Sequence, residues 1–478
     1  FSVSRSFCQT VRLSHSINNE EGKYVTLRKT QIKKWLKGQG FNCELDVPNI
    51  ALLGSGGGER AAVGMLGSLR QLGQDNLLGS LLYMCGVSGT TWCMSSLYSD
   101  PDWSLNKRCD EVIKTLKGPT VNLSKAVEWL KLRKEENQDF NLTDFWGAFT
   151  ASYFMKEVSM HTRCLSEDAH ITNPYPIYSA IELDCRKQDD TKGVWFEMTP
   201  YESGFSGLGA FIPTSCLGSK FEGGALIEKR KEMDMVLLQG SDVSLQNSSF
   251  LGWFSLSLSP LSPPISLTPP PSLCTPPLSL SLSTHPPTLP LSLSTPSLSV
   301  PPPLSIFTDT NVLSSMASKE KIHLVDAGLK FNSPYLPVLR TSRDVDLIIS
   351  LDFSEGDPFE TVFSAKKYAL QQKLPFPPVK ESVREEKDHP QGCYVFEGQN
   401  TPTVMHMPLF NLQNCQGQFH TQAQSGPRTG SIRTAGPECK KFYMIIIIFY
   451  TRVTNWLVAR NKKGDNAEIM EYKNIFIN

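Results

Sequence analysis

The chain has no surplus of charge of either sign. Its 478 residues include 47 Lys and Arg against 47 Asp and Glu, so the formal net charge is 0. Without a net positive charge there is no overall field to attract nucleic acid or an anionic membrane, and we expect no nucleic-acid partner. Contact with lipid must then depend on a local surface, and the sequence indicates no stable protein partner.

Long apolar runs and paired cysteines are also missing. The most apolar stretch, residues 443–450, is far shorter than the roughly 20 residues that a helix needs to cross a bilayer. The 12 cysteines contain no C-x-x-C pair, which argues against a zinc site and against a disulfide scaffold. We therefore expect no metal, a reducing compartment and a cytoplasmic protein without a secretory signal.

Charged residues are missing altogether from one tract. Between Ser255 and Ser305 there is no Asp, Glu, Lys or Arg, and nearly every residue is Ser, Pro or Leu. Prolines at this density remove backbone donors, so the tract is predicted to be an extended linker or disordered. Two alternatives stay open, namely translated simple-sequence DNA from a faulty gene model and a P-x-x-P ligand for a signalling partner.

Composition divides the chain into five segments. Alternating strand-like and helical patterns over 46–240 and 311–414 predict two parts of one α/β domain, because each part alone has few elements. The low-complexity insert takes up 251–307. Residues 1–45 form an N-terminal segment, and 415–478 form a divergent tail.

A glycine-rich turn follows the first apolar run of the domain. Residues 49–53 are strand-like, 54–60 form the turn, and apolar residues at helical spacing follow. Glycines at such a turn let backbone N–H groups face a ligand, and the helix adds its positive N-terminal end. The turn is predicted to hold an anion or a developing oxyanion. A tight turn whose glycines serve only packing is the alternative.

Two nucleotide-binding motifs compete for this turn. Gly56-x-Gly58-x-x-Ala61 formally matches a dinucleotide fingerprint, which also needs an acidic residue after the next strand. None occurs between Asp75 and Asp100. The Gly-Lys-Ser/Thr of a phosphate-binding loop is missing too, so a nucleotide-binding module is a weak alternative and no cofactor is predicted.

A second strand and turn contain a candidate nucleophile. Residues 81–85 are strand-like, and Gly86-Val87-Ser88-Gly89-Thr90 follows, ahead of apolar residues that fit a helix. A serine at such a turn holds its hydroxyl out from the sheet, where an acyl group can approach. Because Thr90 replaces the last glycine of G-x-S-x-G, the motif is only moderately specific, and Ser88 as a plain helix N-cap is the alternative.

A serine nucleophile needs a base. Of the 8 histidines, His323, His406 and His420 lie in suitable places, but none is part of a motif for a Ser-His-Asp triad. The strand-like run 322–325 ends at Asp326, whose pKa would rise if it were buried near the serine, so that it could take the proton directly. Asp326 as a turn-forming residue is the structural alternative.

These motifs together resemble the cytosolic (group IV) phospholipases A2, most closely their gamma type, within the wider patatin-like hydrolases. The matching stretches are 53–61, 86–92 and 324–329, with coverage of about 46–237 and 313–414. The resemblance implies a three-layer α/β hydrolase fold around a central mixed sheet. Further likeness lies in 141–146, 174–177, 209–211, 345–354 and 356–360.

The resemblance implies a Ser-Asp dyad without histidine. Ser88 would be the nucleophile, Asp326 its base, Gly57 and Gly58 the oxyanion donors, and Arg60 the ligand of the phospholipid phosphate. The chemistry agrees, because a phosphodiester attracts a guanidinium and an oxyanion accepts N–H donors. The expected reaction is hydrolysis of glycerophospholipid acyl esters through an acyl-serine, with lysophospholipids as further candidate substrates.

Two more expectations concern the substrate surface. Fewer than fifty residues precede the first catalytic strand, too few for the calcium-dependent docking domain of other family members, so calcium-independent action is expected. Contact with a phospholipid membrane surface would be peripheral, at intracellular membranes. The alternative is a catalytically inactive family fragment or gene-model product with at most a lipid-binding role.

Overall fold

The computed structural model describes most of the predicted domain. The described residues are 11–40, 47–117, 124–136, 170–183, 195–232 and 322–409, the short pieces 144–145, 147–148, 152 and 165, and the backbone of 298–300. The chain divides into two units, Phe1–Val243 with Pro296–Asn478, and Ser244–Thr295. The fold below belongs to the first unit.

The predicted domain boundaries stay a prediction. The tail 415–478 lies outside the described residues, and so does the insert 251–307 except for residues 298–300, which form a strand.

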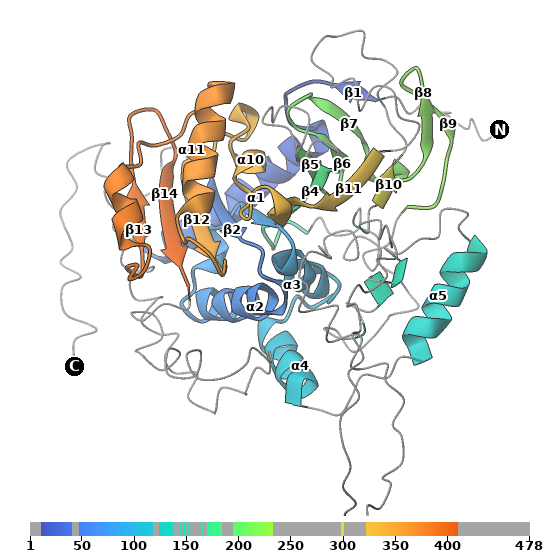
Figure 1. The fold of residues 1–478 in the computed structure, drawn as a ribbon, viewed down its shortest axis with the longest axis horizontal. Helices are drawn as coiled ribbons and strands as arrows, with labels where there is room; N and C mark the ends of the chain where they lie inside the picture. The colour runs from blue at the N-terminus through green and yellow to red at the C-terminus, as the bar shows by residue number, and fades with distance from the viewer. Residues whose placement is uncertain are drawn as a thin grey trace, which may run out of the picture. The chain divides into compact units, whose positions relative to one another are not determined.

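Twelve strands of the described chain form one mixed sheet (Figure 1). They are β1 (Arg12–Leu13), β2 (Ile50–Gly54), β3 (Tyr83–Gly86), β4 (Tyr175–Glu182), β5 (Trp195–Met198), β6 (Glu202–Phe205), β7 (Ala210–Pro213), β10 (Leu298–Val300), β11 (Ile322–Asp326), β12 (Leu347–Asp352), β13 (Tyr394–Phe396) and β14 (Thr403–Pro408). The strand order is β1-β7-β6-β5-β4-β3-β2-β12-β14-β13, and β11 pairs with β4 and with β10. A separate hairpin joins β8 (Lys220–Glu222) to β9 (Ala225–Glu228).

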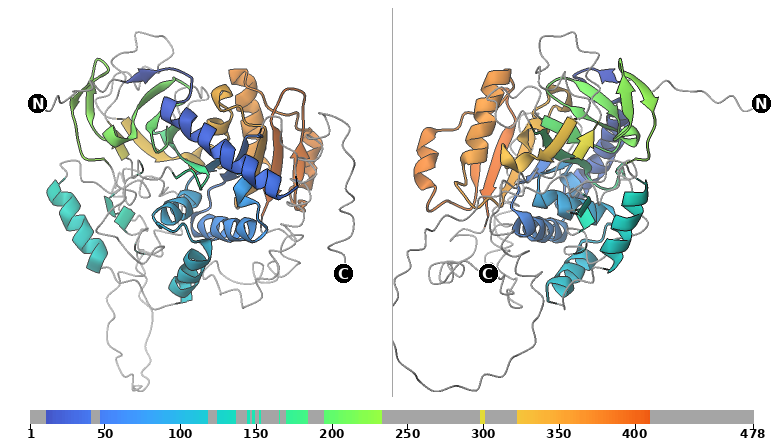
Figure 2. Two further views of the ribbon diagram at one scale, coloured as in Figure 1. Left: turned by 180° about the vertical axis from the view of Figure 1, so that it is seen from behind. Right: turned by 45° about the vertical axis from the view of Figure 1, so that its right-hand side comes forward.

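Helices cover both faces of the sheet. The α-helices are α1 (Asn19–Gly38), α2 (Gly58–Gln74), α3 (Gly89–Tyr98), α4 (Leu105–Lys117), α5 (Ser124–Glu136), α10 (Tyr335–Val338) and α11 (Glu360–Gln372). Short 3-10 helices are η1 (Leu78–Ser80), η5 (Thr214–Cys216), η7 (Ala327–Leu329), η8 (Thr341–Arg343) and η9 (Glu381–Glu386). In Figure 1 α11 lies in front of the sheet, whereas the reverse view in Figure 2 has α1 in front. The predicted α/β architecture, a mixed sheet between helical layers, is confirmed.

Strand polarity brings several loops to one edge of the sheet. The neighbours β14, β12, β2, β3 and β4 run parallel, so the loops that follow β2, β3 and β12 leave the sheet side by side. Gly54, at the end of β2, is paired with Gly86 of β3 on one side and with Leu351 of β12 on the other. β11 runs antiparallel to β4 and places Asp326 opposite Ala180, near the carboxyl end of β4. The end of β11 therefore meets the same loops.

The local sequence explains the elements at this edge. The predicted strands at 49–53, 81–85 and 322–325 are β2, β3 and β11, with ends shifted by one or two residues. β2 and β3 are buried at every position, because a parallel strand that is covered on both faces is apolar throughout. In α2 the buried residues recur at helical spacing, as at Ala61 and Met65.

The N-terminal helix packs onto the domain. Asn18 caps α1 by accepting a hydrogen bond from the Glu20 N–H, and the helix buries Ile32 and Leu36 in the main core. Part of the predicted N-terminal segment 1–45 thus contributes to the core, which the sequence did not predict.

A buried ion network joins α1 to the sheet. Arg343, only 2% exposed, donates to Glu21 of α1 at 2.8 Å and to Glu197 of β5 at 2.9 Å. Arg340 also pairs with Glu197. Burial by itself raises the pKa of Glu197, but the two guanidinium groups outweigh it and hold the pKa at about 2. The carboxylates are thereby paired rather than left alone in the core.

Candidate active site

The loops after β2, β3 and β11 touch one another. A Cβ on Gly89 would clash with the Gly58 carbonyl, so the serine turn and the glycine turn approach backbone to backbone. A Cβ on Gly56 would lie 2.9 Å from the Ser88 Cβ. The structure therefore brings the glycine turn and the predicted nucleophile together at one point.

Ser88 occupies a sharp turn between β3 and α3. Its φ of 53° and ψ of −129° place a residue with a side chain in a region that favours glycine. It stands at the N-cap position of α3, yet its side chain makes no capping hydrogen bond. The hydroxyl instead donates to the carboxylate of Asp326. Ser88 thus stands at the N-cap position without capping the helix through its side chain.

Asp326 is buried beside this hydroxyl. The residue is 4% exposed, and Oδ1 also accepts a hydrogen bond from the Gly328 N–H at 2.7 Å. Burial raises the pKa of Asp326 to about 6, although the Gly328 N–H and the Ser88 hydroxyl both favour the ionised form. The Asp326 side chain thus both forms the turn, through the Gly328 N–H, and contacts Ser88.

The glycine turn has the conformation that its residues predict. Gly57 has φ of 151° and Gly58 has φ of 58°, and a Cβ on Gly57 would lie only 2.9 Å from the Phe353 carbonyl oxygen. A Cβ on Gly58 would meet no described atom within 4 Å, so the space there is open. Gly58 begins α2, and N–H groups of a first helical turn have no intrahelical acceptor.

Arg60 lies beside the glycine turn. Its Nε donates to the Phe353 carbonyl oxygen at 2.9 Å, and its Nη2 lies 3.5 Å from the position of a Cβ on Gly57. Within the described residues the guanidinium makes no further hydrogen bond or ion pair. One edge of the group is thus anchored, and the remaining N–H groups can bind an anion near the turn.

The histidines lie elsewhere in the described fold. His406 is fully buried in β14, where Nε2 bonds the Pro358 carbonyl at 2.6 Å and Nδ1 lies 3.5 Å from Ser350 Oγ. Burial lowers the pKa of His406, against the opposite effect of the nearby Asp352 carboxylate. His323 lies in β11, on the part of that strand that pairs with β10. His420 lies outside the described residues. In the described part of the chain, no hydrogen bond joins a histidine to Ser88.

Polar residues that the sequence did not indicate support the glycine turn. Thr90 Oγ1 donates to the Ser55 carbonyl at 2.6 Å, and Ser55 Oγ accepts from the Phe353 N–H at 2.6 Å. Asn332 Nδ2 donates to the Gly56 carbonyl at 3.3 Å. The signal in the sequence is weak, because Thr90 departs from the G-x-S-x-G motif and Asn332 belongs to no motif.

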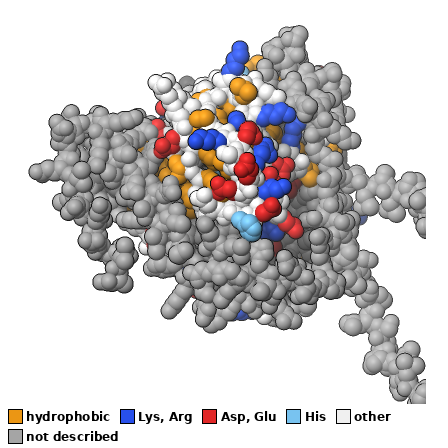
Figure 3. All heavy atoms as spheres, turned by 60° about the vertical axis from the view of Figure 1, so that its left-hand side comes forward, with side chains coloured by type: hydrophobic (Ala, Val, Ile, Leu, Met, Phe, Trp, Pro, Cys, Tyr) orange, Lys and Arg blue, Asp and Glu red, His pale blue; other side chains and the backbone are white. Residues whose placement is uncertain are grey.

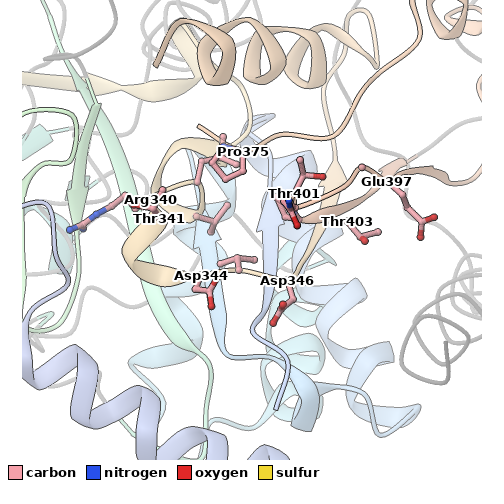
Figure 4. A pocket seen from close by; sticks show the side chains of 14 residues that line it. Arg340, Thr341, Asp344, Asp346, Pro375, Glu397, Thr401 and Thr403 are labelled. Carbon is pink, nitrogen blue, oxygen red and sulfur yellow. The ribbon is translucent and has the colours of Figure 1, made fainter. Parts of the chain in front are cut away.

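A cavity lies at the opposite edge of the sheet. It has a volume of about 870 Å³, and its lining includes Asp346, directly before β12, and Thr403, the first residue of β14 (Figure 4). Because the Ser88 turn lies at the carboxyl ends of the same parallel strands, this cavity is separate from the candidate active site.

The described surface shows no concentration of one charge on the face in view. Figure 3 turns forward the side that carries α11 and β13, where acidic and basic side chains are interspersed. No helix in the described ranges is both long and apolar enough to cross a membrane. Nor do the described side chains of His, Cys, Asp and Glu form a group of three or more that could hold a metal ion.

Comparison with known proteins identifies the family. Residues 50–251 match the family model for the lysophospholipase catalytic domain. The chain is 30% identical to human cytosolic phospholipase A2 gamma, over 98% of this chain and 97% of the relative. It is 29% identical to mouse cytosolic phospholipase A2 zeta, with 84% of this chain covered but only 54% of the relative.

A solved structure gives the same result. Human GIVD cytosolic phospholipase A2 superposes with a TM-score of 0.66 at 25% identity, over 84% of this chain and 59% of that chain. The chain thus spans about three fifths of this neighbour and nearly the whole of the gamma relative. The resemblance predicted from the motifs is confirmed, and the chain belongs to the cytosolic phospholipase A2 family of patatin-like hydrolases, as a phospholipase with a lysophospholipase catalytic domain.

Proposed function

We propose that this protein hydrolyses glycerophospholipid acyl esters with a Ser88–Asp326 dyad, without a histidine and without calcium. The observation that carries the proposal is the buried Asp326 carboxylate beside Ser88: burial raises its pKa to about 6, and hydrogen bonding to the Ser88 side chain favours its ionised form. Such a carboxylate is ionised at neutral pH yet more basic than an exposed one. It can therefore accept the serine proton as the nucleophile attacks.

The reaction would proceed in two steps. Ser88 Oγ attacks the ester carbonyl carbon while Asp326 takes its proton, and the carbonyl oxygen becomes an oxyanion that the Gly57 and Gly58 N–H groups stabilise. The carbon–oxygen bond to glycerol then breaks, and Asp326 returns the proton to the departing lysophospholipid. Water, deprotonated by Asp326, attacks the acyl-serine carbonyl; the bond to Ser88 Oγ breaks, Asp326 returns the proton to that oxygen, and the fatty acid is released.

Arg60 would bind the phosphate of the same substrate. Its anchored guanidinium lies beside the glycine turn, so a phosphodiester bound there would hold its ester near the oxyanion donors. Lysophospholipids contain the same phosphate and an acyl ester, and the proposal includes them as substrates.

The place of action follows from the same chemistry. The nucleophile and the base are both side chains of this chain, so the proposed chemical steps need no calcium ion. The relatives are named cytosolic phospholipases, which supports a cytoplasmic protein here. Because the substrate is a membrane lipid, we propose peripheral contact with a phospholipid membrane surface, with no nucleic-acid partner.

The test measures release of a labelled sn-2 fatty acid from phosphatidylcholine vesicles by the purified full chain, with EGTA or with calcium. Ser88→Ala and Asp326→Asn should each lower kcat by at least about a thousandfold, whereas wild type should be equally active in both media. Ser68→Ala, which alters a serine of α2 whose hydroxyl donates to the Gly64 carbonyl, is the matched control and should stay within about twofold.

Three outcomes would contradict the proposal. Equal turnover by wild type and Ser88→Ala would exclude Ser88 as nucleophile. Activity in calcium that disappears in EGTA would exclude calcium-independent action. A folded wild type that neither hydrolyses lipid nor becomes labelled by a fluorophosphonate would establish the alternative, a catalytically inactive member of the family.

A further inference from the structure

Asn332 joins three loops at the candidate active site. It follows η7 in the loop after Asp326, and its backbone carbonyl accepts a hydrogen bond from the Gly56 N–H at 3.0 Å. Its Nδ2 donates to the Gly56 carbonyl at 3.3 Å and to Ser354 Oγ, in the loop after β12, at 2.7 Å. One side chain thus connects the loops that follow β11, β2 and β12.

The same side chain lies next to the reacting groups. A Cβ on Gly56 would clash with Asn332 Oδ1 and would lie 2.9 Å from the Ser88 Cβ, so both side chains border the same point. A Cβ on Gly328 would lie 2.9 Å from Asn332 Oδ1, and the N–H of Gly328 is bonded to Asp326. Asn332 is therefore packed among the nucleophile, the base and the glycine turn.

The hydrogen bond from Asn332 to the Gly56 carbonyl also affects the direction of a backbone donor, the Gly57 N–H. The carbonyl of Gly56 and the N–H of Gly57 belong to one peptide unit, which is planar, and in its trans form the two groups point in opposite directions. A hydrogen bond that fixes the Gly56 oxygen therefore fixes the direction of the Gly57 N–H. Three glycines in succession give this segment little conformational restriction of its own, so the direction depends on outside contacts.

Most other contacts of the turn hold the peptide unit before this one. Thr90 binds the Ser55 carbonyl, and Ser55 Oγ binds the Phe353 N–H, so both act one residue earlier in the chain. Among the described residues, the Gly56 carbonyl accepts side-chain hydrogen bonds from the adjacent Ser55 hydroxyl, at 3.2 Å, and from Asn332 Nδ2, at 3.3 Å. Of these two, Asn332 is the one that comes from another loop.

We propose that Asn332 is a positioning residue that orients the Gly56–Gly57 peptide, so that the Gly57 N–H points at the oxyanion formed during ester cleavage. This inference rests on the proposed function and adds a residue to it. An oxyanion donor is effective only when it is held in place before charge develops, so loosening the peptide should slow chemistry more than it weakens binding.

The experiment compares full-chain wild type, Asn332→Ala and Asn332→Asp. Active sites are titrated with a fluorophosphonate, so that kcat refers to folded, reactive enzyme only. Asn332→Ala should lower kcat by about tenfold to a hundredfold and leave KM within about twofold. Asn332→Asp keeps the shape but replaces the donor by an anion, so kcat should fall equally and the acidic limb of the pH–rate profile should move to higher pH.

Asn49→Ala is the matched control. Asn49 is a buried asparagine that, like the partly buried Asn332, uses Nδ2 to donate two hydrogen bonds, here to the backbone carbonyls of Arg343 at 3.2 Å and Asp344 at 2.7 Å. It precedes β2 at the opposite edge of the sheet. Its loss should lower Tm while kcat per titrated site stays within about twofold of wild type.

Two results would overturn the inference. An Asn332→Ala enzyme with wild-type kcat per titrated site would show that Asn332 does not orient the donor. So would a loss seen only in Tm and protein yield, as for Asn49→Ala. Failure of the underlying function is distinct, because wild type itself would then lack Ser88-dependent hydrolysis. If Asn332→Ala does not fold, Asn332→Asp gives the same comparison, since it preserves side-chain volume.

Discussion

Burial sets the chemistry of Asp326. An exposed Asp has a pKa near 4 and is a poor base at neutral pH, whereas this carboxyl, 4% exposed, has a pKa of about 6. The Gly328 N–H keeps it oriented and partly compensates for the lost hydration. One residue thereby combines a turn-forming contact with the basicity that a dyad without histidine needs.

Activity should depend on the ionisation of this carboxyl. Ser88-dependent kcat/KM should rise with pH along a single limb with an apparent pKa of about 6 and then level off, because Asp326 accepts a proton only when ionised. The measurement is hydrolysis of a soluble short-chain ester, so that lipid packing does not change with pH. A rate that stays constant as pH falls well below 6 would contradict Asp326 as the base.

The same pKa predicts a gain in stability on substitution. The pKa is about 6 in the folded chain against an ordinary 3.8, so between these values the folded state binds more protons and stability falls as pH rises. A shift of this size corresponds to a loss of roughly 3 kcal/mol in the free energy of unfolding above pH 6. Asp326→Asn should therefore be inactive but more stable than wild type at neutral pH, by urea unfolding.

The pH dependence supplies the control for that comparison. The stability difference between Asp326→Asn and wild type should shrink as pH falls from 6 and disappear near 3.8. Ser88→Ala keeps the buried carboxyl and should not be stabilised in this way. An Asp326→Asn protein that is less stable than wild type at neutral pH would mean that the ionised carboxylate is favourable where it lies.

At the scale of elements, the sequence predicted the parts that depend on local pattern. β2, β3 and β11 are short apolar runs that end at glycine or aspartate, so each candidate residue at their ends could be located. The support of the site could not be predicted in this way. Asn332 and Gly56 are 276 residues apart, and their contact depends on β11 pairing with β4 and on β12 pairing with β2, which no local pattern determines.

The ion network under α1 is a second long-range feature, and it predicts a large effect. Arg343→Met removes the cation between Glu21 and Glu197 and leaves two carboxylates buried. Breaking a buried pair by removing one partner costs about 3–5 kcal/mol, so Tm and the free energy of unfolding should fall sharply. Thermal unfolding followed by circular dichroism is the measurement.

An exposed arginine provides the matched control. Arg384 pairs with Glu381, whose side chain is largely exposed, and lies over the Phe363 ring. Exposed pairs contribute about 0–1 kcal/mol, so Arg384→Met should change stability only slightly. If the two variants lost equal stability, the buried network would not be what fixes α1 to the sheet.

At the scale of the whole molecule, the prediction of one domain with an insert can be tested by deletion. In the described ranges, β9 ends at Glu228 and β10 begins at Leu298, so the sheet takes no described strand from the residues between them. Replacing Ser244–Thr295 by about twelve Gly and Ser residues, which reach up to roughly 40 Å, should preserve Tm within about 2 °C and Ser88-dependent hydrolysis within about twofold. A deletion protein that unfolds would show that the tract belongs to the domain, and one that folds but loses hydrolysis would assign the tract a part in the reaction.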